Sequence, residues 1–125
     1  MTMRRFNVAV TTASDGSATA YSPFLSGYIH SVQYVKTDFA DGVDFTITAE
    51  ATGQTIWTQS DVNAAVTKFP REGTTTTAGV ASLYASGGTA VNDRVALGRD
   101  RVKIVIAQGG NAKVGAFNIL VDDGV

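Results

Sequence analysis

A chain of 125 residues is expected to form one domain, and a domain of this size buries roughly two-thirds of the surface that its unfolded form exposes. The net charge of −1 excludes a general electrostatic attraction to nucleic acid or to an anionic membrane. The absence of cysteine excludes disulfides, zinc sites with cysteine ligands and thiol nucleophiles. Thirteen glycines among many threonines, alanines and valines favour short strands joined by tight turns, so we expect an all-β protein.

The N-terminal residues show neither an export signal nor a membrane span. The apolar stretch after Arg4 and Arg5 is interrupted by Asn7 and ends at Thr11, which is too short for the apolar region of a signal peptide. No run in the chain approaches the ~20 apolar residues that a membrane-spanning helix needs. We therefore expect a soluble protein without an export signal and without membrane contact.

Alternation of apolar and polar residues predicts the first strands. Phe6, Val8 and Val10 alternate with other residues and predict a strand that follows an N-terminal arm of about residues 1–5. A turn at residues 14–17 leads to residues 18–22, which we expect to return as a hairpin partner before Pro23. The run of residues 25–37 predicts a long strand whose alternation changes phase, as in a β-bulge or in a strand buried on both faces.

Residues 38–57 carry the clearest pattern in the chain. Four apolar residues at every second position from Val43 to Ala49 alternate with polar ones, which predicts a strand with one buried face. The turn dipeptide Thr52-Gly53 then precedes the short run Thr55-Ile56-Trp57. The segment is therefore predicted to be a β-hairpin.

The middle of the chain is less regular. Residues 61–66 allow either one helical turn with Asp61 as its N-cap or a polar loop. Residues 67–71 favour an edge strand, because Pro70 cannot donate a hydrogen bond to an interior ladder. Residues 72–92 form a long irregular loop rich in threonine and glycine. Loops of this length in a compact domain are commonly functional, so we expect it to be a contact arm.

The last third returns to clear alternation. Residues 101–106 and 117–121 predict two strands, and the glycine-rich residues 108–111 between them predict a hairpin turn. Gly109, Gly110 and Gly115 lack the lysine and hydroxyl spacing of a phosphate-binding loop. With about eight or nine short strands and no linker, we expect a single β-sandwich domain or barrel spanning residues 1–125.

A catalytic site is not indicated by the titratable and nucleophilic residues. His30 is the only histidine, and Ser26 and Ser31 lie near it in sequence. A triad needs a carboxylate that orients the histidine and a serine on a strained turn. Ser86 is nearest to such a turn, but Tyr84 stands where the motif requires glycine. A packing role for His30 is favoured, and we expect the protein not to be an enzyme.

Two further groups of residues allow a binding function. Asp38, Asp41 and Asp44 crowd one corner and could supply some of the oxygens that calcium needs, but their spacing departs from that of a calcium-binding EF-hand loop and Asp-Gly is a favoured turn dipeptide. The aromatic residues could form a platform for sugar rings, although they suit a core or a protein contact as well. These aromatic residues are Tyr21, Tyr28, Tyr34, Trp57 and Tyr84.

Four pieces of the chain stand out together: MRRFNVAVTT, YVKTDFADGVDFTITAEATGQTIWT, VNAA ahead of FPR, and NDRVALGRDRVKIVIAQGGNAKVGAFNILV. With these pieces the chain resembles a family of small proteins from tailed phages and prophages, whose genes often lie among the head genes. In size and β-rich pattern it also resembles the capsid cement (decoration) proteins of such phages.

The resemblance implies an all-β, jelly-roll-like β-sandwich of about eight short antiparallel strands. It implies a homo-oligomer, trimer or dimer, that binds the major capsid protein on the outer capsid surface of the virion after synthesis in the host cytoplasm. The family has no catalytic motif, so no residue inherits a catalytic, cofactor or metal-binding role. The contact residues that we expect are Arg4, Arg5 and Phe6 in the N-terminal arm and Leu83 and Tyr84 in the long loop. The alternatives are a tail or head–neck structural protein and a glycan-binding β-sandwich.

Overall fold

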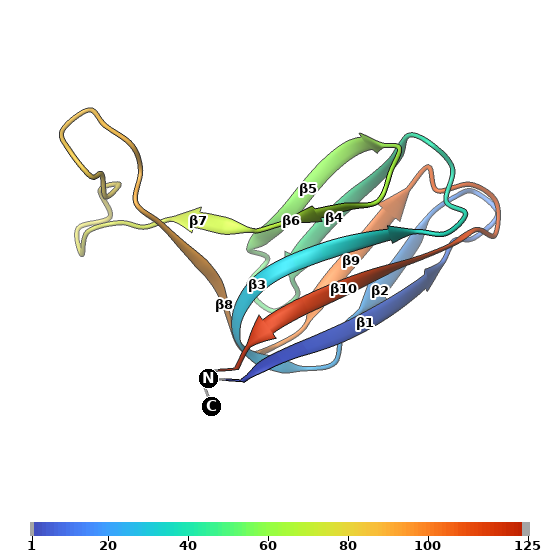
Figure 1. Cartoon of the computed structure of the whole chain (residues 1–125), viewed down its shortest axis with the longest axis horizontal. Helices are drawn as coiled ribbons and strands as arrows, with labels where there is room; N and C mark the ends of the chain where they lie inside the picture. The colour runs from blue at the N-terminus through green and yellow to red at the C-terminus, as the bar shows by residue number, and fades with distance from the viewer. Residues whose placement is uncertain (1, 124–125) are drawn as a thin grey trace.

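The computed structural model describes residues 2–123, and all regular structure in this part of the chain is β-strand. The strands form two antiparallel sheets that pack face to face (Figure 1). The prediction of an all-β sandwich is therefore confirmed. The ten strands are β1 (Met3–Thr11), β2 (Ala18–Tyr21), β3 (Leu25–Lys36), β4 (Val43–Ala49), β5 (Thr55–Val62), β6 (Val66–Lys68), β7 (Arg71–Gly73), β8 (Asn92–Asp100), β9 (Val102–Ala107) and β10 (Val114–Asp122).

The first sheet has the strand order β1-β10-β3-β8-β7, and the second has the order β2-β9-β4-β5. Two strands pair with β3 along the edge that faces away from β10. The first half of β3 pairs with β8, and the second half pairs with the short strand β6. Strand β8 in turn leaves the sandwich and pairs with β7 at its other end. The first sheet therefore continues into a projection beyond the sandwich.

The hairpin predicted for residues 38–57 is confirmed. Strands β4 and β5 pair with each other, and the backbone N–H of Ala49 donates to the carbonyl of Gln54 at 2.9 Å to close the turn. Gly53 has a φ of 75°, a left-handed conformation that glycine adopts without steric cost. The alternating residues of β4 from Val43 to Ala49 face the core.

Two other predicted hairpins are wrong. Residues 18–22 were expected to pair with the first strand, but β1 pairs with β10 and β2 pairs with β9. Residues 108–111 connect β9 to β10, and these two strands lie in different sheets. In both places a short, glycine-containing turn crosses from one sheet to the other. A turn sequence alone does not distinguish such a crossing from a hairpin.

The change of phase in residues 25–37 is a β-bulge, one of the two explanations that the sequence allowed. Ser31 pairs with Leu120 and Ile29 pairs with Val121, so His30 is the extra residue on β3. Side chains at odd positions point into the core before the bulge, and those at even positions do so after it. The bulge therefore lets both halves of a twelve-residue strand bury apolar side chains.

Residues 61–66 contain no helical turn: β5 extends to Val62, and a turn leads to β6. Asp61 has a φ of 58°, and its backbone N–H donates to Asp44 Oδ1 at 2.9 Å rather than starting a helix. The edge strand predicted for residues 67–71 is present only in part. Strand β6 ends at Lys68, and β7 begins at Arg71.

An aromatic cluster fills the space between the sheets. Phe45 on β4 lies with its ring centroid 4.6 Å from that of Tyr34 on β3 and 5.0 Å from that of Phe117 on β10. Trp57 on β5 packs edge-on against Phe45 at 5.5 Å. All four side chains are buried. Because rings from both sheets meet at Phe45, this residue lies at the centre of the core.

The N-terminal arm predicted for residues 1–5 is wrong from Met3 onward, and residue 1 lies outside the described part of the chain. Met3, Arg4 and Arg5 belong to β1 and pair with Asp122, Val121 and Leu120 on β10. The alternation in this stretch begins only at Phe6, which is why the sequence alone places the start of the strand too late. Pairing with β10 extends the strand in the folded protein.

Candidate interaction surfaces

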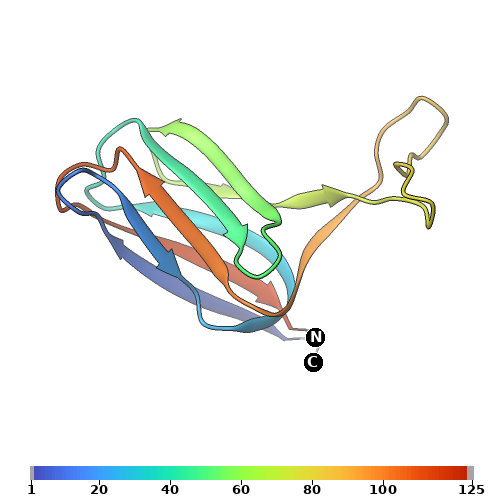
Figure 2. The ribbon, with the colours of Figure 1, turned by 180° about the vertical axis from the view of Figure 1, so that it is seen from behind.

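The long loop predicted for residues 72–92 is an ordered projection, which we call the β-arm and define as residues 71–94. It extends along the long axis of the molecule well beyond the sandwich (Figures 1 and 2). Its stem is the pairing of β7 with β8. At the end of the stem, Ser82 bonds to the backbone on both sides of the stem. Its N–H donates to the carbonyl of Thr74, and its carbonyl accepts from the N–H of Val91, both at 2.9 Å.

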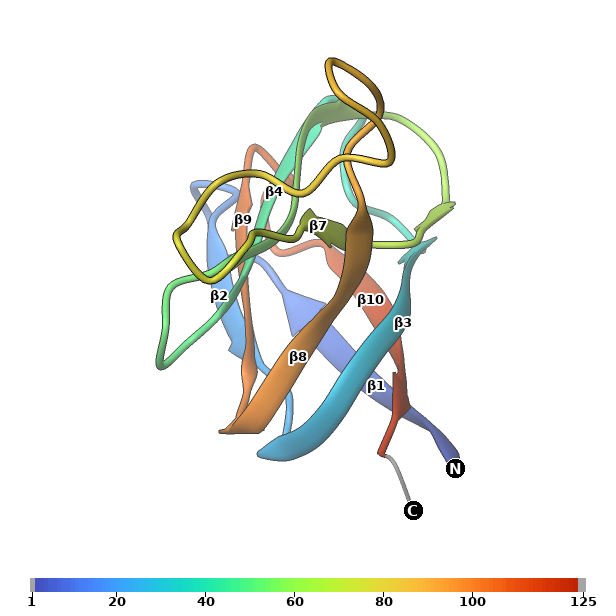
Figure 3. The same ribbon diagram turned by 90° about the vertical axis from the view of Figure 1, so that its left-hand side faces the viewer.

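Two small hairpins form the tip of the β-arm. In the first, Thr75 bridges to Ala81, and the N–H of Thr76 donates to the carbonyl of Val80 at 2.8 Å. In the second, Leu83 bridges to Ala90 and the N–H of Tyr84 donates to Thr89 at 3.0 Å. Figure 3, which views the β-arm end on, shows the two hairpins spreading to different sides of the stem. Hydrogen bonds within the β-arm therefore give it a defined shape.

The tip of the β-arm is uncharged and exposes several large apolar side chains. Residues 73–92 contain no Asp, Glu, Lys or Arg, although these residues make up 17% of the chain. Tyr84 is 76% exposed, Val80 is 63% exposed and Leu83 is 42% exposed. Exposed apolar side chains, tyrosine and a lack of charge together are typical of the central part of a protein–protein interface.

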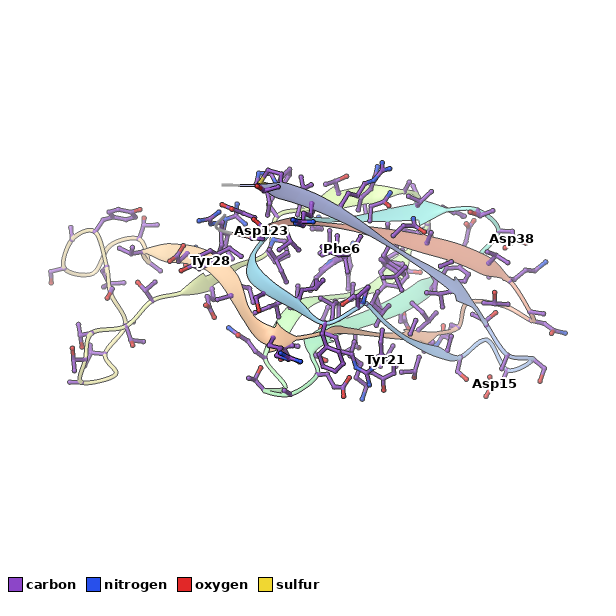
Figure 4. The ribbon with its side chains drawn as sticks, turned by 90° about the horizontal axis from the view of Figure 1, so that it is seen from below. Phe6, Asp15, Tyr21, Tyr28, Asp38 and Asp123 are labelled. Atoms are coloured by element: carbon purple, nitrogen blue, oxygen red, sulfur yellow. The ribbon has the colours of Figure 1, made fainter. Side chains whose placement is uncertain are left out.

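Charged residues at the base join the β-arm to the sandwich. Arg94 Nη1 donates to Asp122 Oδ2 at 2.9 Å, and its guanidinium carbon lies 4.5 Å from the ring centroid of Tyr28. Glu72 accepts a hydrogen bond from Gln54 in the β4–β5 turn. Figure 4 shows Tyr28 near the base of the β-arm. These contacts hold the stem against both sheets.

The five contact residues predicted from the sequence lie on two separate elements. Leu83 and Tyr84 are exposed at the tip of the β-arm. Arg4, Arg5 and Phe6 lie on β1 within the sandwich. Arg5 is exposed there, whereas Phe6 is half-buried against the core. The structure therefore places these residues on two separate surfaces.

A hollow of about 270 Å³ lies beside the start of β1. Arg4 borders it and pairs with Asp123, with Arg4 Nε 2.5 Å from Asp123 Oδ2. Phe24, which the sequence analysis did not single out, also lines it and is 63% exposed. The guanidinium of Arg101 lies 5.2 Å from the ring of Phe24 and 4.0 Å from that of Tyr21. A hydrogen bond to Glu50 raises the pKa of Arg101 above its ordinary value.

His30 has the surroundings of a packing residue. Its ring packs edge-on against Phe69 at 5.6 Å, and no hydrogen-bond partner for its buried Nδ1 occurs among the described residues. Ser26 Oγ accepts a hydrogen bond from the N–H of Arg99, and Ser31 is buried on the bulge. No hydrogen bond in the described part of the chain joins His30 to a serine or to a carboxylate, as a triad would require.

The three aspartates considered for calcium each bond to a different part of the backbone or to a lysine. Asp38 accepts from the N–H of Val114, Asp41 pairs with Lys36, and Asp44 accepts from the N–H of Asp61. Within residues 2–123, no group of three or more acidic, histidine or cysteine side chains lies close enough to hold a metal ion. The aspartates therefore stabilise the turns at the end of the sandwich that Figure 4 marks with Asp38.

The aromatic residues do not form the sugar-binding platform that the sequence allowed. Tyr34 and Trp57 are buried in the core. Tyr21 and Tyr28 each hold an arginine over one ring face and lie apart on the molecule (Figure 4). Tyr84 lies at the tip of the β-arm. Stacking of a sugar ring needs aromatic faces on one surface, and these five side chains are dispersed.

Residues 2–123 contain no helix that is long and apolar enough to cross a membrane. No family model, no curated protein and no solved structure matches the chain.

Proposed function

We propose that the protein is a structural component of a tailed-phage virion without enzymatic activity, a capsid cement protein that binds the outside of the shell formed by the major capsid protein. The observation that carries this proposal is the β-arm, an ordered projection that ends in exposed Val80, Leu83 and Tyr84 and carries no charge over residues 73–92. An isolated protein gains nothing from exposing such a surface, whereas a neighbouring subunit would bury it.

The shape of the β-arm supports binding to a partner that is already assembled. Its hairpins are closed by their own backbone hydrogen bonds, so little conformational entropy is lost when a partner covers them. The length of the projection lets it reach across a boundary between shell subunits while the sandwich rests on one of them (Figure 2). A cement protein acts in this way, and many copies on one shell multiply the effect of a modest contact.

The order of the strands supports a jelly-roll architecture. Strands β1, β10, β3 and β8 lie in one sheet, and β2, β9, β4 and β5 lie in the other. Along the chain these eight strands alternate between the sheets, except at the β4–β5 hairpin. This order is that of two successive Greek keys, and viral capsid domains use double-sheet jelly rolls of this type.

The test is the binding of the purified protein to shells that lack it, with bound copies counted by quantitative mass spectrometry. Thr74 and Val91 are hydrogen-bonded neighbours, so a variant in which Asn-Gly replaces residues 75–90 closes the stem as a hairpin and leaves the sandwich intact. We expect hundreds of copies of the unaltered protein per shell and at least tenfold weaker binding of the shortened variant, by analogy with loss of an interface hot spot. The control Val114→Ser removes an exposed apolar side chain from the other end of the sandwich and should bind normally.

Two results would contradict the proposal. Equal binding by the shortened variant would show that the β-arm is not the contact surface. A dozen or fewer copies on purified virions would place the protein in the tail or neck, which is the main alternative for a domain of this composition.

A further inference from the structure

Strand β1 lies at a free edge of the described sandwich, and its only charged side chains, Arg4 and Arg5, stand near one end of the strand. It covers nine residues and pairs with β10 without a register shift, and its sequence contains neither proline nor glycine. The other free edges are interrupted. Strand β2 has four residues and is followed closely by Pro23, and the β4–β5 pairing has two register shifts. Natural sheets protect exposed edges by such interruptions, so an uninterrupted edge indicates a pairing partner.

The backbone groups on this edge can be assigned from the hydrogen bonds at the two ends of β1. The N–H of Thr12 donates to Lys113 at 2.9 Å, and the carbonyl of Thr2 accepts from Asp123 at 3.0 Å. Antiparallel strands alternate between bonded and non-bonded positions, so the even-numbered residues of β1 bond to β10. The odd-numbered residues direct their N–H and carbonyl groups away from the sheet: Met3, Arg5, Asn7, Ala9 and Thr11.

We propose that two copies of this chain pair through β1 in antiparallel orientation, about a two-fold axis at Asn7, to form one continuous sheet. Residues whose N–H and carbonyl groups point away from the sheet must pair with one another. A register centred on Asn7 meets this requirement and pairs all nine residues of β1 with residues of β1 in the second copy. Shifting the centre by one residue leaves at least two residues at an end unpaired. This inference does not depend on binding to a capsid.

Charge also favours this register. It places Arg5 opposite Ala9 of the second copy and Arg4 opposite Val10, so no arginine faces another. A register centred on Arg5 would put the two Arg5 side chains directly opposite each other, and like charges in this position are destabilising. The electrostatic cost therefore falls on a competing register and not on the proposed one.

A row of side-chain amides ends at the proposed axis. Gln33 on β3 accepts from Asn118 on β10 at 3.2 Å, and Asn118 Oδ1 accepts from Asn7 Nδ2 at 2.9 Å. In the proposed register Asn7 faces its own copy. The second side-chain N–H of each Asn7 can then donate to the Oδ1 of Asn7 in the other copy. The row would thus continue across six strands, three from each copy, which gives the second copy a specific match that an unrelated peptide lacks.

Introduced cysteines test the register directly, because the chain has none of its own. Bonded antiparallel residues have Cα atoms about 5.5 Å apart, which is within the range of a disulfide. We therefore expect Asn7→Cys to form a disulfide-linked dimer under mild oxidation. Residue 5 lies about 13 Å from residue 5 of the second copy in this register, since strands rise roughly 3.3 Å per residue. Arg5→Cys alone should stay unlinked, whereas a mixture of Arg5→Cys and Ala9→Cys should form the mixed dimer.

A charge pair at residue 9 tests the same interface without a covalent bond. Ala9→Glu places a carboxylate opposite Arg5 of the second copy, and Ala9→Lys places a like charge there, twice per dimer in each case. By sedimentation analysis we expect the glutamate variant to dimerise at least about tenfold more tightly than the lysine variant, given the usual size of cross-strand charge effects. Both variants should melt alike as monomers, because Ala9 is exposed on the outer face of the sheet.

The proposal is overturned if the unaltered protein stays monomeric at all concentrations or if the two residue 9 variants have equal dimer affinities. It is also overturned if Arg5→Cys alone is cross-linked in preference to Asn7→Cys, which would mean another register. Loss of the dimer on shortening the β-arm would assign dimerisation to the β-arm and contradict pairing through β1.

Discussion

Replacing Tyr34 by phenylalanine should make the protein more stable, although most substitutions at buried positions destabilise. The Tyr34 side chain is 0% exposed, and its hydroxyl has no hydrogen-bond partner among the described residues. Its ring packs against Phe45 and Phe117, with centroids 4.6 and 5.4 Å away. Phenylalanine keeps these ring contacts and removes only the oxygen. The substitution therefore isolates the free-energy cost of burying one hydroxyl.

The size of the effect follows from that cost. Burying a hydroxyl without a hydrogen bond costs roughly 1–3 kcal/mol in mutational data. Removing the oxygen leaves a small void, which offsets part of the gain. We expect a net increase of about 1 kcal/mol in the free energy of unfolding, which corresponds to a rise in Tm of roughly 3–5 °C for a domain of this size.

Urea unfolding followed by tryptophan fluorescence measures this change, because Trp57 lies in the same cluster. The midpoint should rise while the m-value stays unchanged. Tyr28→Phe is the matched control: Tyr28 is partly exposed, and that variant should lie within about 0.5 kcal/mol of the unaltered protein. A loss of 1 kcal/mol or more in Tyr34→Phe would refute the reasoning, since it would mean that a buried water satisfies the hydroxyl.

The same substitution should change how stability depends on alkaline pH. Burial, with a smaller contribution from the negative charge of Asp41, raises the pKa of Tyr34 to about 12. In the unfolded chain the phenol titrates near its ordinary value of about 10. Between these two values only the unfolded chain loses the proton, so stability falls as pH rises. Melting curves from pH 9 to pH 11.5 should show a smaller loss for Tyr34→Phe than for the unaltered protein; parallel losses would contradict the assigned pKa.

Two further substitutions test the core and the backbone. Phe45→Ala should cost about 3–5 kcal/mol in urea unfolding, because it leaves a cavity and removes the ring contacts at the centre of the core; a cost below 2 kcal/mol would mean that the sheets collapse into the space. Gly27→Ala should cost at least about 2 kcal/mol, because Gly27 has a φ of 135° and an added Cβ would overlap the backbone oxygen of Asp122. Gly53→Ala, at a left-handed turn with open space around it, should cost less than Gly27→Ala by the same measurement.

Local patterns predicted the elements whose residues interact with near neighbours in the chain. The alternation from Val43 to Ala49 and the turn dipeptide Thr52-Gly53 specify the β4–β5 hairpin, because both strands and the turn are contiguous. The change of phase in residues 25–37 indicated either a bulge or a strand buried on both faces, and the pairing of β3 with β10 shows that it is a bulge at His30. Exposure of Leu83 and Tyr84 could also be anticipated from the irregular segment around them.

The partners of distant strands were not predictable in this way. Nothing local in Met3–Arg5 indicates a strand, and these residues are extended because β10, more than a hundred residues away, supplies the hydrogen bonds. The same holds for the turns before β2 and β10, which cross between sheets although they resemble hairpin turns. The β-arm was predicted as a loop because its order comes from hydrogen bonds around Ser82 that join three segments.

The sequence by itself therefore determined the all-β class, the central hairpin, the change of phase in residues 25–37 and the absence of charge over residues 73–92, since each depends on the order of side chains along a short segment. The tertiary structure alone decided which edge stays open, which aromatic residues enter the core and how the β-arm projects. These properties depend on pairing between segments far apart in the chain, where the cost of loop closure and the fit of opposing faces select one arrangement.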